Sequence, residues 1–172
     1  GKVVGGGLPV GIIAGKRQFM DALDGGWWQF GDASVPTVGV TYFAGTFVRH
    51  PLALAAVRAV LNHLKQEGPA LQQRVTGMTE RMAAELNAFF KEVGAPLEIR
   101  GFASLWKTFY TVEQPWGDLL FVMLRDRGIH ILDNFPCFLT TSHTDEDIRS
   151  LIQAYREAAA EMQASGVFPV RI

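Results

Sequence analysis

The apolar positions of this chain follow a helical period from residue 51 onward. Apolar side chains recur there every three or four residues, which is the spacing of a helix with one buried face. The spacing predicts a helix over residues 51–66, begun by Pro51, and a longer helix from Pro69 that ends before Gly94. The longer helix has the more regular stripe, and we expect these residues of it to form core: Leu71, Val75, Met78, Met82, Leu86, Phe89, Phe90 and Val93.

The rest of the chain alternates extended and helical patterns. Residues 98–112 alternate polar and apolar side chains, with Gly101 either a bulge or a point of close backbone approach. Thr144 and Asp147 have the spacing of a capping box before a last helix. Between residue 112 and Thr144 we expect a short helix over residues 117–127 and two strands. The strands are IHILD (residues 129–133, which includes His130) and CFLTTS (residues 137–142).

This order of elements predicts the fold class. Residues 69–172 read helix, strand, helix, strand, strand, helix, which indicates a small α/β or α+β unit with a sheet covered by helices. Residues 1–50 are instead rich in Gly, Pro and aromatic side chains, and they contain about two strand-like runs without an accompanying sheet. We therefore expect the chain to be the end of a longer protein, with a boundary between residues 1–68 and residues 69–172.

Composition narrows the choice of partners. The 172 residues are 48% hydrophobic with a net charge of −1, and no basic tract indicates binding to nucleic acid. No apolar run is long enough to span a membrane, and a single cysteine, Cys137, excludes an internal disulfide. We expect a cytoplasmic protein in which Cys137 is a small buried side chain, with no metal site, since no pair of histidines has a ligand spacing.

The first eleven residues, GKVVGGGLPVG, place one lysine beside three consecutive glycines. Glycine reaches positive φ at little cost and leaves room for a ligand to approach the backbone. The stretch resembles the segment around the cofactor-binding lysine of class III pyridoxal-phosphate aminotransferases and glutamate-1-semialdehyde aminomutase. The resemblance implies that Lys2 is the catalytic residue and that it binds the cofactor covalently.

A second block, AGTFVRHPLALAA (residues 44–56), resembles the family's segment A-G-T-x-x-x-x-P-L-A-x-A-A. In the family the threonine reaches the cofactor phosphate of the neighbouring subunit, which implies that Gly45 and Thr46 bind cofactor in a homodimer. The sequence Phe47-Val48-Arg49-His50 departs from the small residues and asparagine typical of the aminomutase. It is similar instead to aminotransferase domains of hybrid polyketide and nonribosomal peptide synthetases.

The resemblance implies the C-terminal part of a fold-type-I pyridoxal-phosphate transferase: the end of the large domain, residues 1–68, and the small C-terminal α/β domain, residues 69–172. The implied reaction moves an amino group from an amino acid to a ketone or aldehyde, here a β-ketoacyl chain on an acyl carrier domain. Phe43, Arg49 and His50 are candidate substrate contacts; a solvated role at the start of the helix stays open for Arg49 and His50. An apolar channel wall is expected from Trp27, Trp28, Phe30, Tyr42 and Phe43.

Two other functions stay open. The chain is compatible with a glutamate-1-semialdehyde aminomutase or a free-standing ω-aminotransferase. It is also compatible with a non-catalytic structural or interaction piece, because the N-terminal part of the family's cofactor site lies outside this sequence.

Overall fold

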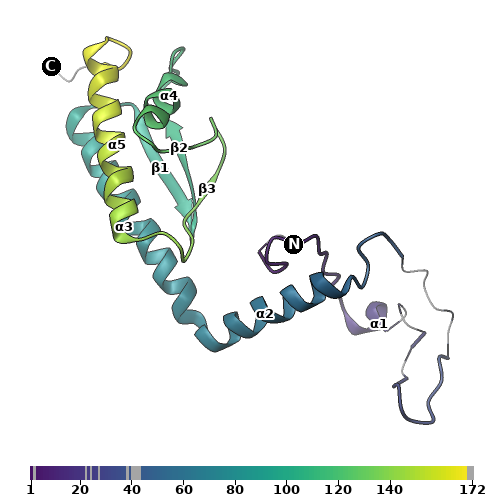
Figure 1. The fold of residues 1–172 in the computed structure, drawn as a ribbon. Helices are drawn as coiled ribbons and strands as arrows, with labels where there is room; N and C mark the ends of the chain where they lie inside the picture. The colour runs from purple at the N-terminus through teal and green to yellow at the C-terminus, as the bar shows by residue number, and fades with distance from the viewer. Residues whose placement is uncertain are drawn as a thin grey trace. The chain divides into compact units, whose positions relative to one another are not determined.

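The structure is a computed structural model that describes residues 1, 3–21, 23, 25–26, 28–37, 39 and 44–169. The chain forms two compact units, Gly1–Glu67 and Gly68–Ile172 (Figure 1). That these units are the end of a large cofactor domain and a small domain stays a prediction. No helix in the described residues is long and apolar enough to cross a membrane.

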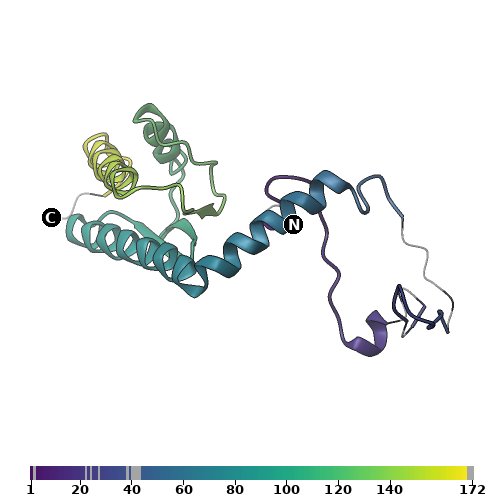
Figure 2. The same cartoon turned by 60° about the horizontal axis from the view of Figure 1, so that its bottom comes forward.

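The C-terminal unit is built on a three-stranded antiparallel sheet. Strands β1 (Leu97–Phe102), β2 (Leu105–Tyr110) and β3 (Cys137–Phe138) lie in that order. Helices α3 (Pro69–Val93) and α5 (Asp145–Ala164) pack side by side, and α3 also packs against β1 (Figures 1 and 2). Helix α4 (Leu119–Asp126) packs against α5.

The core of this unit lies between the apolar sides of helices α3, α4 and α5 and the apolar residues of the β1–β2 hairpin. Tyr155 of α5 is fully buried, and its ring lies 6.1 Å from that of Phe90 and 6.5 Å from that of Trp106, measured between centroids. The predicted stripe of α3 supplies much of the remaining core: Val75, Met78, Met82, Leu86 and Phe90 are buried, and Phe89 and Val93 pack against them.

The side chain of Asn87 forms hydrogen bonds with the backbone of Ile99 at the edge of the sheet. The side chain of Asn87 on α3 accepts a hydrogen bond from the backbone N–H of Ile99 at 2.7 Å and donates one to the Ile99 carbonyl at 2.9 Å. Strand β1 is an edge strand, whose unpaired backbone groups would otherwise be free to pair with another chain. One side chain therefore satisfies both edge-facing groups of Ile99.

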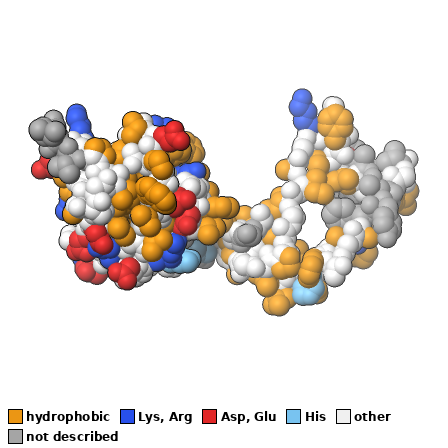
Figure 3. All heavy atoms as spheres, turned by 90° about the horizontal axis from the view of Figure 1, so that it is seen from above, with side chains coloured by type: hydrophobic (Ala, Val, Ile, Leu, Met, Phe, Trp, Pro, Cys, Tyr) orange, Lys and Arg blue, Asp and Glu red, His pale blue; other side chains and the backbone are white. Residues whose placement is uncertain are grey.

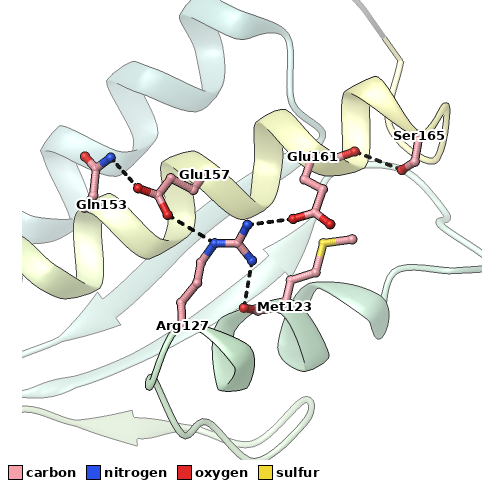
Figure 4. Close-up of polar contacts among 6 residues, drawn as sticks. All are labelled: Met123, Arg127, Gln153, Glu157, Glu161 and Ser165. Atoms are coloured by element: carbon pink, nitrogen blue, oxygen red, sulfur yellow. Dashed lines mark hydrogen bonds and ion pairs between the residues drawn. The ribbon is translucent and has the colours of Figure 1, made fainter.

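Helices α4 and α5 are joined by one arginine (Figure 4). The Arg127 guanidinium donates to Glu157 at 3.2 Å, to Glu161 at 2.6 Å and to the carbonyl of Met123 at 3.0 Å. These carboxylates raise the pKa of Arg127, with the hydrogen bond to Glu161 the largest cause.

The four predicted helices are confirmed. Helix α2 spans Pro51–Glu67, α3 begins at Pro69, and Gly94 ends α3 in the left-handed conformation with φ 70°. Thr144 and Asp147 form the predicted capping box at the start of α5. The short helix expected over residues 117–127 is α4.

The strand predictions are largely wrong after α4. Residues 129–132 have no regular structure and Asp133 lies in a turn, so IHILD is not a strand and His130 is not a sheet residue. Arg125 holds this segment through the carbonyl of Ile131, at 3.4 Å, and the carboxylate of Asp133, at 2.6 Å. Of CFLTTS only Cys137–Phe138 is a strand, and Cys137 is half-buried rather than buried; burial raises the pKa of its thiol.

Gly101 marks a close approach and not a bulge. The register of β1 and β2 is continuous, with Gly101 opposite Trp106. A Cβ at Gly101 would lie 2.6 Å from the carbonyl oxygen of Leu105, which is too close for any side chain.

The N-terminal unit contains two helices, α1 (Arg17–Met20) and α2, and no strand among its described residues. The two strands expected in residues 1–50 are therefore absent from the described part, and residues 41–43 lie outside it. Among the described residues of this unit, Ala53 is the only buried hydrophobic side chain. Figure 3 shows hydrophobic side chains at the surface of both units; in this one they include Ile12, Ile13, Phe30, Phe47, Leu52, Leu54 and Leu61.

Candidate functional site

The glycine-rich segment at the start of the chain folds into successive tight turns. The N–H of Gly5 donates to the carbonyl of Gly1 at 2.8 Å, that of Gly6 to Val3 at 3.2 Å, and that of Leu8 to Gly5 at 3.0 Å. Lys2 lies outside the described residues.

The structure explains why each of positions 5–7 is occupied by glycine. Gly5 is buried, and a Cβ there would lie 2.6 Å from Cγ1 of Val10 and closer still to the carbonyl oxygen of Leu8. Gly6 and Gly7 have φ angles of 58° and 89°, which favour glycine. The cluster therefore serves a compact backbone turn directly after Lys2.

The glycine turn rests on helix α2. A Cβ at Gly6 would lie 3.4 Å from Cγ2 of Val60 and 3.6 Å from Cβ of Ala56, which is ordinary van der Waals contact. The backbone of the turn thus lies against the apolar side of α2.

The second block forms a pair of turns that lead into α2. The N–H of Val48 donates to the carbonyl of Gly45 at 3.1 Å, and that of His50 to Phe47 at 3.2 Å. The N–H of Leu54 then donates to His50 at 3.0 Å as the helix begins. Between these turns Arg49 has a φ of 58°, an uncommon conformation for a residue other than glycine.

Residues 9–13, which follow the glycine turn, line one pocket of about 720 Å³ within the N-terminal unit together with residues 45–50, Ala53 and Leu54. A volume of this size suits a small-molecule ligand. Four of the predicted site residues meet in it, namely Gly45, Thr46, Arg49 and His50. Phe43, the remaining predicted substrate contact, lies outside the described residues, as Lys2 does.

The chemistry of the pocket fits a phosphate-bearing group. Thr46 is exposed, so its hydroxyl is free to donate to a phosphate oxygen, and Arg49 supplies a guanidinium. The described lining residues include no aspartate or glutamate. An anion would therefore meet donors and positive charge there without a competing carboxylate.

Sequence reasoning missed the apolar lining residues that come from residues 9–13. Ile12 and Ile13, 63% and 58% exposed, line the pocket together with Pro9 and Val10. The signal was the apolar pair Ile12-Ile13 directly after Gly11. The expected aromatic wall is not found here, since Trp28 and Phe30 are not lining residues and Trp27, Tyr42 and Phe43 lie outside the described part.

Comparison with solved structures identifies the fold. No family model matches the chain. The structure is similar to an omega-transaminase from Sphaerobacter thermophilus, with a TM-score of 0.77 and 22% identity over 95% of this chain and 38% of that one. It is similar to a beta-phenylalanine aminotransferase from Variovorax paradoxus, with a TM-score of 0.77 and 24% identity over 100% of this chain and 39% of that one.

A third similar structure is a transaminase with pyridoxal phosphate bound, with a TM-score of 0.74 and 23% identity over 96% of this chain and 38% of that one. The chain therefore has the fold of the C-terminal part of pyridoxal-phosphate-dependent aminotransferases, as the sequence predicted. It spans about 38% of the length of these chains.

Proposed function

We propose that this chain is part of a pyridoxal-phosphate-dependent aminotransferase. The observation that carries the proposal is the pocket in which Gly45, Thr46, Arg49 and His50 meet without a described carboxylate. The fold supports it, since the similar structures are transaminases and one of them contains pyridoxal phosphate.

In this proposal each residue has a separate task. The cofactor, when bound, supplies an electron sink that makes the carbon beside the transferred nitrogen acidic. Lys2 would bind the cofactor and, as a free amine, would accept the proton from that carbon and deliver it to the cofactor's C4′ carbon. Thr46 donates its hydroxyl to the phosphate, and Gly45 begins the turn that presents it.

The acceptor that we propose is a β-ketoacyl chain on an acyl carrier domain, as in lipopeptide or polyketide–peptide biosynthesis. The apolar lining of the pocket supports an alkyl substituent, since Ile12, Ile13, Phe47, Val48 and Leu54 surround it. Phe43, Arg49 and His50 are the proposed substrate contacts. The amino donor in this reaction is an amino acid.

We also propose that the active protein is a cytoplasmic homodimer in which Thr46 serves the cofactor of the neighbouring subunit. Exposed apolar residues of α2, among them Leu52, Leu54 and Leu61, support a protein contact on this helix. A free-standing ω-aminotransferase is the second candidate function, because one of the similar structures is an omega-transaminase. An aminomutase or a non-catalytic piece has no observation in its favour.

The experiment that tests the proposal locates the cofactor. After borohydride reduction of the protein loaded with pyridoxal phosphate, peptide mapping should find the cofactor on Lys2, and Lys2→Ala should abolish both labelling and transamination. Lys16→Ala, in the exposed segment before α1, is the matched control and should change neither. Cofactor mapped to Lys16 or Lys65 would contradict the proposal.

Thr46→Val tests the phosphate contact. Loss of a hydrogen bond to a charged group should weaken cofactor binding by about 1.5–3 kcal/mol, measured by equilibrium titration with pyridoxal phosphate. Unchanged affinity in a normally folded variant would remove Thr46 from the site.

A further inference from the structure

We infer that Arg49 is a specificity-determining residue that binds an oxyanion of the acceptor, so that the pocket selects acceptors carrying a carboxylate or a phosphate. This inference rests on the proposed aminotransferase function. It assigns Arg49 to the substrate and Thr46 to the cofactor, although the two side chains line the same pocket.

The charge of Arg49 is not matched by a carboxylate among the described residues of the pocket. Arg49 is exposed to the pocket, and none of the ion pairs among the described residues involves it. Six arginines do have a carboxylate partner, namely Arg17, Arg100, Arg125, Arg127, Arg149 and Arg156, whereas Arg58, Arg74 and Arg81, like Arg49, form no ion pair with the described residues. Arg49 differs from those three in that it lines the pocket. Because no described lining residue is acidic, the guanidinium of Arg49 is available to an anion from outside the chain.

The backbone conformation of Arg49 is unusual for a residue other than glycine. With φ 58°, Arg49 occupies a conformation that glycine or asparagine adopts with less strain. The hydrogen bonds Val48 N–H to Gly45 and His50 N–H to Phe47 fix this turn. The turn alone would favour glycine here, so the geometry points to a use for the arginine side chain.

The walls of the pocket combine apolar side chains with a small polar group. Apolar side chains from residues 9–13 and from Phe47, Val48 and Leu54 surround the polar group formed by Thr46, Arg49 and His50. Such a pocket suits a molecule with an alkyl part and one anionic end. Guanidinium binds carboxylate and phosphate through two parallel hydrogen bonds, and this geometry distinguishes them from neutral oxygen groups.

Two kinds of acceptor carry an oxyanion that Arg49 could bind in this way. The oxyanion is either the carboxylate of a free β-keto acid or the phosphate of the phosphopantetheine arm of a carrier domain. Three probes separate them: β-ketooctanoate, β-ketooctanoyl phosphopantetheine, and β-ketooctanoyl pantetheine, which lacks the phosphate. The corresponding methyl ketone is the fully neutral reference.

The variants separate charge from backbone. Arg49→Asn removes the charge and keeps a residue that tolerates positive φ, whereas Arg49→Lys keeps the charge without the two-pronged geometry. Arg58→Gln is the matched control, since Arg58 is an exposed arginine of α2 outside the pocket. For each protein, kcat and KM are measured with every probe, and cofactor affinity and direct binding of each anionic probe are measured by titration.

We expect Arg49→Asn to raise KM and weaken binding for one anionic probe by roughly tenfold to a hundredfold, the effect of losing a hydrogen bond to a charged group. Arg49→Lys should recover part of the loss. In both variants kcat, the KM for the methyl ketone and the affinity for the cofactor should stay unchanged. Loss confined to β-ketooctanoate identifies the carboxylate. Loss confined to the phosphopantetheine probe identifies the carrier arm.

Three results would overturn the inference. They are weaker cofactor binding in Arg49→Asn with unchanged KM, equal losses for anionic and neutral acceptors, and the same losses in Arg58→Gln. If the wild-type protein binds no cofactor and transfers no amino group, the proposed function fails by itself. Titration with the anionic probes still tests Arg49 in that case, because retained binding in Arg49→Asn would contradict its role.

Discussion

At the scale of single residues, the core contains a buried pair of hydroxyl groups that are hydrogen-bonded to each other. The hydroxyls of Thr108 on β2 and Tyr155 on α5 lie 2.7 Å apart, and both residues are buried. Burial raises the pKa of Tyr155, and the hydrogen bond with Thr108 lowers it by a smaller amount. Both hydroxyls are satisfied only while the sheet and α5 are packed together.

Tyr155→Phe should destabilise the protein by about 1–3 kcal/mol, because it leaves the buried Thr108 hydroxyl without its partner. Urea unfolding followed by circular dichroism measures the loss. The double variant Thr108→Val with Tyr155→Phe should recover part of it, since neither hydroxyl then remains. A double variant with the summed cost of both single changes would show that the pair contributes nothing of its own.

The sequence predicted four of the residues that line the pocket, because a local motif contains them. Gly45, Thr46, Arg49 and His50 lie within six consecutive positions, and a short segment brings them together without long-range packing. The left-handed backbone of Arg49 has no such signal, since nothing in FVRHP favours positive φ. The pairing of Thr108 with Tyr155 was equally hidden, because it joins residues far apart in the chain.

At the scale of the element, helix α5 begins with a capping box that depends on an ionised carboxylate. Asp147 accepts the backbone N–H of Thr144 at 2.7 Å, and its own N–H donates to the Thr144 hydroxyl at 3.2 Å. The backbone hydrogen bond, followed by that of the Thr144 hydroxyl, holds the pKa of Asp147 below its usual range. Folding therefore favours the ionised form of this side chain.

The depressed pKa gives a pH dependence with a definite sign. Its contribution to stability should be complete above the unfolded pKa of about 3.9 and be lost as pH falls through the lower folded value. Thermal unfolding between about pH 6 and about pH 2 should show a smaller acid destabilisation in Asp147→Asn than in the wild type. Asp145→Asn, in the same helical turn, is the control, and an equal effect there would contradict the assignment.

The helices were predictable and the last strands were not, for a physical reason. Pro69, Gly94 and the capping box mark helix ends through local backbone requirements. IHILD has the composition of a strand, yet the contacts of Arg125 with Ile131 and Asp133 hold it as an irregular segment beside α4. That tertiary contact overrides local propensity, and no pattern within the segment reveals it.

At the scale of the whole molecule, the two units differ in how much apolar surface they bury. The hydrophobic core consists of residues between Val75 and Phe168, all in the C-terminal unit. The described part of the N-terminal unit buries only Ala53 among its hydrophobic side chains. The C-terminal unit therefore has its own source of stability.

Residues 69–172 expressed alone should fold, whereas the full chain should be more prone to association because of the exposed apolar residues of the N-terminal unit. A cooperative thermal transition by circular dichroism, with a monomer by sedimentation, is the expected result for residues 69–172. Loss of that transition after removal of residues 1–68 would show that this core needs the N-terminal unit.

The contact of Asn87 with Ile99 makes one backbone amide a reporter of docking between helix and sheet. The Ile99 N–H donates to a side chain of α3 and not to a neighbouring strand, so its hydrogen exchange depends on α3 staying against β1. Amides of β1 that bond to β2 exchange only when the hairpin opens. If helix α3 separates while the hairpin persists, Ile99 should exchange faster than Arg100, which identifies the opening event from a single pair of adjacent signals.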